Sequence, residues 1–379
     1  MSMSYNRICI VAHGYMMRDG SKRRSLGGIQ TYVEALIRLL QPLSRELVIV
    51  QPGDVAFEMD DPLGARVIGV PGYGRPIGRY YEKELAGKCD ATICTHLPWA
   101  QWCSGPRLIS IQHGISWDGF DSRTRGFVRS LRKVKYEHFD MWRNRWMLRK
   151  ILTKLDRIIC VDLNFPNWVR ATYPAHNWEA KLRYVPNFGD PIGAADLEAK
   201  LSKKEDQITV LIARRFELIR GLPLMAQIVN EIYDDWPNAR FVFAGWGAQK
   251  ERMQEILRGK GRCEIVRLSP EDVAKANVAA DIVAIPTMWS EGTSFSCIEG
   301  MCAGAAVLAT SIGGLGNIIL PGYNGLLVSP VYEEIRDSLQ TLLGDAALRR
   351  ALARNGYETA QTTFSRAVWG TRILKVLSE

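Results

Sequence analysis

Short apolar runs alternate with longer stretches of helical periodicity through most of the chain. In the first half, six runs of four to six residues are apolar on both faces and end in polar or glycine-containing turns. These predicted strands are 7–12, 46–50, 67–70, 91–95, 107–112 and 157–161. A strand that is apolar on both faces needs helices on both sides, as in a parallel sheet. The clearest early helix is Gly28–Leu40, whose apolar residues recur at helical spacing.

A second alternating series begins after a turn-rich segment at 188–193. Its predicted strands are 208–212, 241–244, 264–268, 282–285 and 306–309, with helices at 222–233, 249–257, 269–280 and 296–303. The fold class is therefore α/β, with two Rossmann-like, doubly wound domains, residues 1–190 and 191–360. Residues 361–379 are predicted to form a last helix that could return to either domain. Ligands of such sheets lie outside the carboxyl ends of the strands, so we expect a site in a cleft between the domains.

Composition restricts the class of protein. With 47% apolar and 23% charged residues, the 379-residue chain is typical of a globular protein. No run approaches the ~18 apolar residues of a membrane-spanning helix. Residues 1–6 are polar and run into the first strand, unlike a secretory signal, so we expect a cytoplasmic protein. No two of the eight cysteines have the spacing of a zinc or redox motif, so reduced, buried thiols are favoured.

The excess positive charge is confined to the first half. Residues 1–190 carry a net charge of +10, from 28 basic and 18 acidic residues, whereas residues 191–379 carry −1. Segment 121–157 alone holds twelve basic and four acidic residues, interleaved with aromatic ones. This pattern favours a helix on an anionic membrane surface, and the candidate contacts are Arg129, Arg132, Lys133, Trp142 and Trp146. A solvated helix whose apolar stripe is core, or a nucleic-acid patch, would give the same composition.

The densest chemistry lies at 286–314. A predicted strand ends before Pro286, and the loop that follows carries Glu291 and leads into a helix that carries Glu299. The amides of 293–296 would then lie at a helix amino terminus, where an anion such as a nucleotide diphosphate can bind. Glu299 could accept hydrogen bonds from a vicinal diol. A capped helix with two surface glutamates is the alternative.

Two further segments are consistent with phosphate binding. Arg215 and Arg220 share a loop at the carboxyl end of strand 208–212, and guanidinium groups suit bidentate phosphate contacts. Gly27 and Gly28 open the first helix and would let a ligand approach the backbone closely. Solvated arginines and an ordinary turn remain the alternatives.

These motifs resemble the retaining GT-B enzymes of glycosyltransferase family 4. The resemblance rests on the spacing Glu291-x7-Glu299, the Arg215…Arg220-Gly221 loop, the Val185-Pro186-Asn187 segment and the Gly313-Gly314…Gly322–Leu326 tail. It is strong over 157–330 and looser before that. It implies two facing Rossmann-like domains, a nucleotide-sugar donor and a reaction that needs no metal.

The resemblance also implies a role for each matching residue. Arg215 and Arg220 would neutralise the donor diphosphate, Gly27 and Gly28 would lie against it, and the amides of Ser294 and Phe295, beside Thr293, would hold the phosphate. Glu299 would bind the ribose hydroxyls, Glu291 and His113 would face the transferred sugar, and backbone groups at Leu268 would read the base. His13 and His96, which follow two other strands, are favoured as packed loop residues.

The function that we expect is transfer of a hexose-type sugar, with retention, from a UDP- or GDP-sugar to a saccharide acceptor. The basic segment 121–157 suggests that the acceptor is lipid-linked, as in surface polysaccharide or lipopolysaccharide assembly, with the enzyme peripheral on the inner face of the cell membrane. No cofactor, metal or nucleic acid is expected. A nucleotide-sugar epimerase on the same fold and a non-catalytic basic module are the alternatives.

Overall fold

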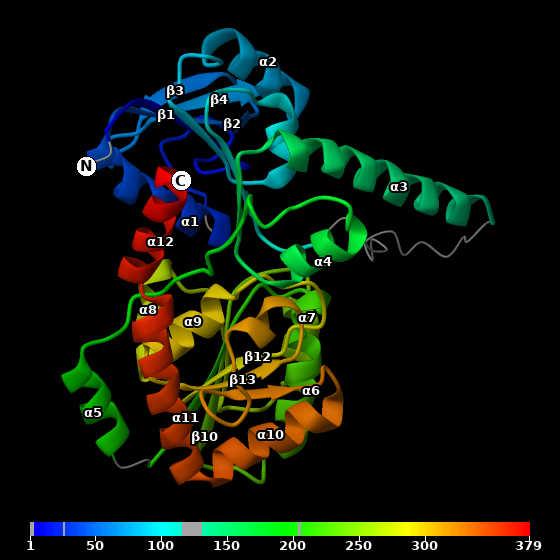
Figure 1. Ribbon diagram of the computed structural model, residues 1–379. Helices are drawn as coiled ribbons and strands as arrows, with labels where there is room; N and C mark the ends of the chain where they lie inside the picture. Colours follow the sequence, from blue (N-terminus) through cyan, green and yellow to red (C-terminus); the bar gives the residue numbers. More distant parts are fainter. Residues whose placement is uncertain (1–3, 26, 116–130, 204–205) are drawn as a thin grey trace. The chain divides into compact units, whose positions relative to one another are not determined.

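The chain folds into two compact α/β units. The computed structural model describes residues 4–25, 27–115, 131–203 and 206–379, with the backbone alone over 131–140. Unit 1 comprises Met1–Val185 together with Ile373–Glu379, and unit 2 is Pro186–Arg372. The chain thus passes into unit 2 a few residues before the expected boundary at 190, and it re-enters unit 1 within its last helix (Figure 1).

Unit 1 is built on an eight-stranded sheet in the order β3-β4-β2-β1-β5-β6-β7-β8. The strands are β1 (Tyr5–Val11), β2 (Ser44–Gly53), β3 (Phe57–Asp60), β4 (Arg66–Pro71), β5 (Ala91–Cys94), β6 (Leu108–Gln112), β7 (Arg157–Cys160) and β8 (Leu182–Tyr184). All pairings are parallel except β3 with β4. The six predicted strands of this half are confirmed, and the short strands β3 and β8 escaped prediction.

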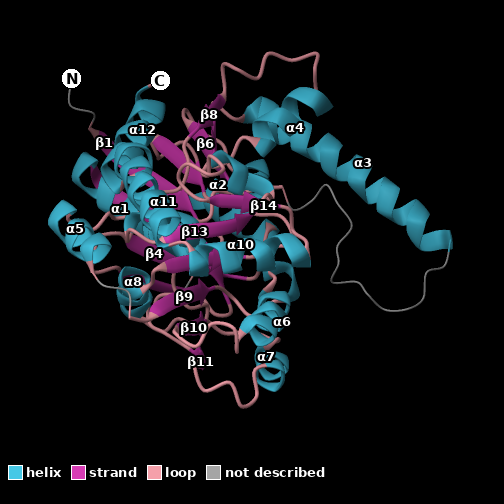
Figure 2. Cartoon of the chain, turned by 90° about the horizontal axis from the view of Figure 1, so that it is seen from below, coloured by secondary structure: helices cyan, strands magenta, loops and turns pink. Residues whose placement is uncertain are grey.

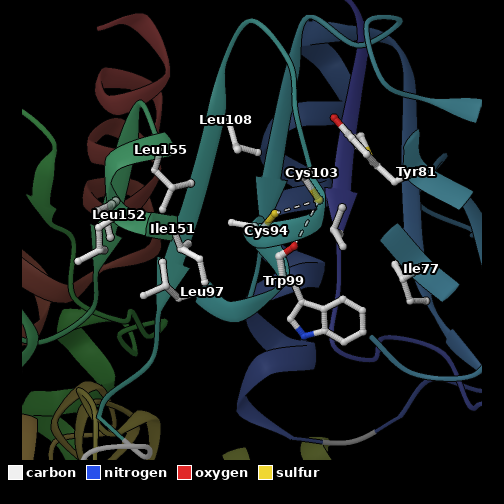
Figure 3. Packing of buried hydrophobic residues seen from close by; sticks show 14 of the residues in the cluster. Ile77, Tyr81, Cys94, Leu97, Trp99, Cys103, Leu108, Ile151, Leu152 and Leu155 are labelled. Atoms are coloured by element: carbon white, nitrogen blue, oxygen red, sulfur yellow. Dashed lines mark hydrogen bonds between the residues drawn. The ribbon is translucent and has the colours of Figure 1, made fainter. Parts of the chain in front are cut away.

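Helices and a 3-10 turn cover this sheet. They are α1 (Gly28–Leu40), α2 (Arg75–Glu84), the 3-10 segment η2 (Leu97–Trp102), α3 (Leu131–Lys154) and α4 (Asn164–Thr172). One face of the sheet packs against apolar residues of α2, η2, α3 and α4. Figure 3 shows part of this core, where Trp99 of η2 lies near Ile77 of α2, and Ile151 of α3 lies near Leu97 of η2.

The cysteines fit this core. All eight are free thiols, and all but Cys263 are buried, as the sequence predicts. Cys94 and Cys103 lie in the unit 1 core with their sulfur atoms 3.7 Å apart (Figure 3). In the part of the chain that the structure describes, no group of three or more His, Cys, Asp or Glu side chains could hold a metal ion.

Unit 2 contains a six-stranded parallel sheet in the order β11-β10-β9-β12-β13-β14. The strands are β9 (Ile208–Ala213), β10 (Ala239–Ala244), β11 (Cys263–Val266), β12 (Ile282–Ile285), β13 (Ala306–Thr310) and β14 (Leu326–Val328). The helices are α5 (Ala194–Ser202), α6 (Leu222–Ile232), α7 (Lys250–Ile256), α8 (Pro270–Ala279), α9 (Phe295–Cys302), α10 (Tyr332–Gly344), α11 (Ala346–Thr359) and α12 (Arg366–Ser378), which ends in unit 1. The five predicted strands are confirmed, although the third ends at Val266 rather than Leu268, and β14 was missed.

Alternating residues of these strands belong to two separate cores. Val210 and Ile212 face the core that holds the apolar residues of α6 and α10, whereas Leu211 faces the core built with α9. Figure 2 shows the strands of unit 2 with helices α6, α7 and α10 about them. Burial on both faces explains why these strands read as continuous apolar runs in the sequence.

Both sheets reverse their strand order at one place. In unit 1 the reversal lies between β1 and β5, and in unit 2 it lies between β9 and β12. In doubly wound folds the loops at the carboxyl ends of the strands beside such a reversal form the ligand site. The fold therefore directs attention to the loops after β1 and β5, and to those after β9 and β12.

Candidate active site

Two arginines and one glutamate meet at the strand-order reversal of unit 2. Arg214 follows β9, Arg220 ends a 3-10 turn (Leu218–Arg220) in the same loop, and Glu291 lies in the loop after β12. Both guanidinium groups donate to the same oxygen, Oε2 of Glu291. The side chains are only 7%, 19% and 12% exposed, respectively, so the interactions are shielded from water.

Hydroxyl groups complete this cluster. Arg214 donates to Ser294 Oγ at 2.8 Å and to Thr287 Oγ1 at 2.9 Å. The hydroxyl of the buried Thr287 lies 3.2 Å from Glu291 Oε2, to which it donates. The network holds the planar Arg214 guanidinium in one orientation. Burial lowers the pKa of Arg220, and Glu291 opposes that shift, so the side chain keeps its charge at neutral pH.

Glycines bring the loops into contact. Gly221 has φ +71°, and a side chain there would overlap the carbonyl oxygen of Pro286. Gly314 donates its N–H to the Glu291 carbonyl at 2.8 Å, and a side chain at Gly314 would collide with the backbone of Gly292. These close approaches fix the glutamate loop between the arginine loop and the Gly313–Gly314 turn.

Helix α9 begins beside the cluster. Ser294 is its N-cap residue, and Phe295 and Ser296 form its first turn, where N–H groups have no partner within the helix. Thr293 is anchored from the start of unit 2, because its hydroxyl accepts from the Asn187 N–H at 2.9 Å and its carbonyl from Asn187 Nδ2 at 2.5 Å. Thr293, Ser294 and Phe295 therefore lie beside Arg214, in the arrangement that an anion site requires.

Glu299 lies one turn into α9 and is half-buried. Its carboxylate has no hydrogen-bond or ion-pair partner among the described residues. Burial raises the pKa of Glu299, Arg214 lowers it, and Asp190 raises it further. An acceptor group that is half-buried and not engaged within the protein is available to a ligand hydroxyl.

Two predicted residues lie away from this cluster. Arg215 is 52% exposed and pairs with Glu217 at 3.1 Å. Leu268 lies beyond the end of β11 and packs against the unit 2 core. The sequence interpretation did not include Arg214, because alternation of side chains at a strand end does not say which of two adjacent residues faces the loop after β12.

Three histidines gather at the strand-order reversal of unit 1. His13, His96 and His113 follow β1, β5 and β6, and the rings of His13 and His96 are 5.4 Å apart. Tyr73 Oη shares a hydrogen bond of 2.8 Å with His13 Nδ1, and Tyr32 packs edge-on against His113 at 5.2 Å. Among the described residues, neither His96 Nδ1 nor His113 Nε2 has a hydrogen-bond partner, although both atoms are buried.

Burial keeps these histidines neutral. It lowers the pKa of His113 to about 4, with a smaller contribution from His96 and an opposing hydrogen bond to Thr95. It likewise lowers the pKa of His96 to about 4, with His13 contributing. The pKa of His13 is lowered by burial and by Arg18. Neutral imidazoles can exchange hydrogen bonds with hydroxyl groups, as a saccharide site requires.

Gly27 and Gly28 lie at the exposed start of α1. Gly27 is its N-cap residue with φ 154°, and its carbonyl accepts from the Thr31 N–H at 3.0 Å. The Gln30 side chain donates to the Gly14 carbonyl at 2.9 Å, which ties the helix start to the loop after β1. The two glycines thus belong to the unit 1 edge that carries His13.

Helix α3, which holds the described part of the basic segment, has a buried side and an exposed side near its carboxyl end. Leu148, Ile151 and Leu152 of α3 are buried in the unit 1 core, whereas Trp142 is 63% and Trp146 is 50% exposed. Lys150 Nζ lies 3.6 Å from the Trp146 ring centroid. Arg129 lies outside the described residues, as do the side chains of Arg132 and Lys133. The apolar residues of α3 therefore belong partly to the unit 1 core, whereas Trp142 and Trp146 lie outside that core.

Within the residues that the structure describes, no helix combines the length and the apolar character needed to cross a bilayer.

Known proteins resemble this chain in fold and in sequence. Residues 194–359 match the family Glycosyl transferases group 1. An uncharacterised glycosyltransferase of Methanocaldococcus jannaschii is 23% identical over 372 residues, which cover 92% of this chain and 93% of the relative. Three further curated relatives align over 34 to 49% of their own lengths.

Solved structures show the same architecture. Sucrose-phosphate synthase of Thermosynechococcus elongatus superposes with a TM-score of 0.75 at 18% identity, covering 98% of both chains. Anabaena HepE, solved in complex with UDP, superposes with a TM-score of 0.71 at 13% identity, covering 98% of this chain and 99% of that one. The protein has the GT-B fold of glycosyltransferases. Together with the family match in unit 2, this supports a glycosyltransferase.

Proposed function

We propose that the protein transfers a sugar from a nucleotide-diphosphate donor to a saccharide acceptor, with retention of the anomeric configuration. The observation that carries the proposal is the buried cluster in which Arg214 and Arg220 share Glu291 beside the start of α9. Two fixed cations and a helix amino terminus suit a diphosphate, whose charge grows as the bond to the sugar breaks. A UDP or GDP donor fits this chemistry, and the UDP complex of HepE supports a UDP-type ligand on this fold.

The diphosphate is the leaving group, so the residues that face it control the rate. Arg214 and Arg220 would neutralise the oxygens that gain charge, in the role that a divalent ion plays elsewhere, so we propose a reaction that needs no metal. The N–H groups of Ser294 and Phe295 would bind the same phosphate, and Glu299 would accept hydrogen bonds from the ribose hydroxyls.

The acceptor would attack the sugar on the same face from which the diphosphate leaves. The acceptor oxygen forms the new bond at the anomeric carbon, the bond to the phosphate oxygen breaks, and the acceptor proton goes to that phosphate oxygen. Glu291 and His113 would contact the transferred sugar. With its pKa lowered to about 4, His113 would serve as a neutral hydrogen-bonding group rather than a cation.

We further propose that the acceptor is lipid-linked and that the protein works in the cytoplasm, peripheral to the membrane. Support comes from α3, whose Trp142 and Trp146 are exposed beside Arg143 and Lys150. Indole rings favour the interface between water and lipid, and cationic side chains are attracted to anionic headgroups.

The decisive test compares two neighbouring arginines. We expect Arg214→Ala to lower turnover of a UDP- or GDP-sugar by about 100-fold or more, because one fixed cation facing the leaving diphosphate is lost. Arg215→Ala is the matched control, since Arg215 is exposed and pairs only with Glu217 among the described residues, and it should retain nearly full activity. Unchanged turnover in Arg214→Ala would refute the proposal. Incubation of the donor without an acceptor separates transfer from epimerisation.

A further inference from the structure

An exposed aromatic side chain stands next to the arginine loop and has no part in the chemistry described above. Trp246 follows β10, and 48% of its surface is exposed. The guanidinium carbon of Arg267, which follows β11, lies 5.9 Å from the centroid of the Trp246 ring. An indole ring that is half exposed beside a proposed binding site offers a flat apolar face on which a ligand can pack.

The backbone fixes this tryptophan close to the proposed diphosphate site. The Phe216 N–H donates to the Trp246 carbonyl at 2.8 Å, only two residues after Arg214. The Gly245 N–H donates to the Val266 carbonyl at 2.8 Å, and a side chain at Gly245 would overlap the Arg214 carbonyl. Trp246 is therefore held between the loop after β9 and the loop after β11.

The direction in which a nucleotide would extend follows from the same loops. On the β13 side, the Gly313–Gly314 turn packs directly on the backbone of the glutamate loop. On the other side, the loops after β10 and β11 present Trp246 and Arg267, both exposed. A ligand whose diphosphate lies at the β9/β12 reversal can run along the carboxyl edge of the sheet over β10 and β11.

We propose that Trp246 is the surface on which the nucleobase of the donor stacks, with Arg267 holding the indole ring by its charge. The inference rests on the proposed function and adds a base-binding residue to it. Every nucleobase has an aromatic face, so this contact supplies affinity for the base without choosing among bases. Trp289, 44% exposed after β12, is the competing aromatic surface in unit 2.

The test uses titration calorimetry on the full chain with UDP, GDP, ADP and inorganic pyrophosphate. We expect Trp246→Ala to weaken the best-bound nucleotide about 5- to 100-fold, as the loss of a base–aromatic stack does. Pyrophosphate has no base, so its affinity should not change. Trp246→Phe keeps an aromatic face and should recover most of the nucleotide affinity, and Trp289→Ala should behave like the wild type.

Each other outcome overturns the assignment. An unchanged nucleotide affinity in Trp246→Ala would show that the base does not stack on Trp246. An equal loss of pyrophosphate affinity would show damage to the phosphate pocket instead. A loss of nucleotide affinity in Trp289→Ala but not in Trp246→Ala would assign the base contact to Trp289. If the wild type binds pyrophosphate and nucleotides equally well, only the base contact fails. If it binds none of them, the proposed function fails as well.

Discussion

The two strand-order reversals have the same topology and opposite chemistry. In unit 2 the loops after β9 and β12 carry two arginines that share one glutamate. In unit 1 the loops after β1 and β5 carry His13 and His96, whose pKa values burial lowers. The first is a site of fixed charge and suits a phosphorylated group, whereas the second is neutral and suits hydroxyl groups. The same topology thus carries two chemically different loop clusters, one charged and one neutral.

An effect comparable to that of Arg214→Ala should come from the glutamate that the two arginines share. We expect Glu291→Gln to lower turnover about 100-fold, because an uncharged amide is a weaker hydrogen-bond partner for the transferred sugar than a carboxylate. UDP should bind as tightly as before or more tightly, since a negative charge next to the diphosphate is removed. Steady-state kinetics and calorimetry measure the two quantities.

Glu217→Gln is the control for this variant, because Glu217 pairs with the exposed Arg215 in the same arginine loop. A Glu291→Gln variant that loses UDP affinity along with turnover would show that Glu291 supports the fold of the site rather than the reaction.

The buried histidines of unit 1 should make the free energy of unfolding depend on pH. The pKa of His96 and that of His113 are about 4 in the folded protein, against about 6.5 for an unperturbed histidine. Between these values the unfolded chain binds protons that the folded chain does not, so the free energy of unfolding should fall as the pH drops from 6.5 to 4. Each unit of pKa shift corresponds to about 1.4 kcal/mol.

Urea unfolding at pH 7 and pH 5 measures this dependence. A His96→Gln/His113→Gln variant should show a flatter pH profile than the wild type. Identical profiles would mean that these two rings titrate normally in the folded protein.

The smallest effect concerns the surface of unit 1. We expect Trp142→Ala/Trp146→Ala to reduce co-sedimentation with vesicles that contain anionic lipid, because both indoles are exposed on the basic helix α3. Lys150→Gln should weaken binding by on the order of 1 kcal/mol. Trp289→Ala provides an exposed tryptophan from the other unit as a control. Binding that ignores lipid charge would argue against a membrane role.

The sequence was a good guide to the fold because both sheets are buried on both faces. Strands such as β9 and β12 are continuous apolar runs and were recognised almost to the residue. The strands that escaped, β3, β8 and β14, have three or four residues each and are only partly buried. Such short, partly buried strands lack the continuous apolar run by which the other strands were recognised.

The candidate site was predictable in kind but not in detail. The spacing of Glu291 and Glu299 located the loop and helix that carry them, and Arg220 lies in the loop after β9 where the sequence places it. The sequence interpretation named Arg215 and not Arg214, because only the direction of the chain at the end of β9 decides which of two adjacent side chains pairs with Glu291. The histidine cluster likewise depends on the order of β1, β5 and β6 in the sheet, which the motifs do not specify.

The placement of residues 373–379 has a consequence for how the protein is made. Leu377 is fully buried in unit 1, its carbonyl accepts from Tyr5 Oη at 3.3 Å, and Glu379 pairs with Arg183 at 2.6 Å. Because these residues follow all of unit 2 in the chain, unit 1 can complete its packing only after unit 2 has been synthesised. A fragment cut at Val185 would lack that piece, and studies of isolated domains would need a linker that restores it.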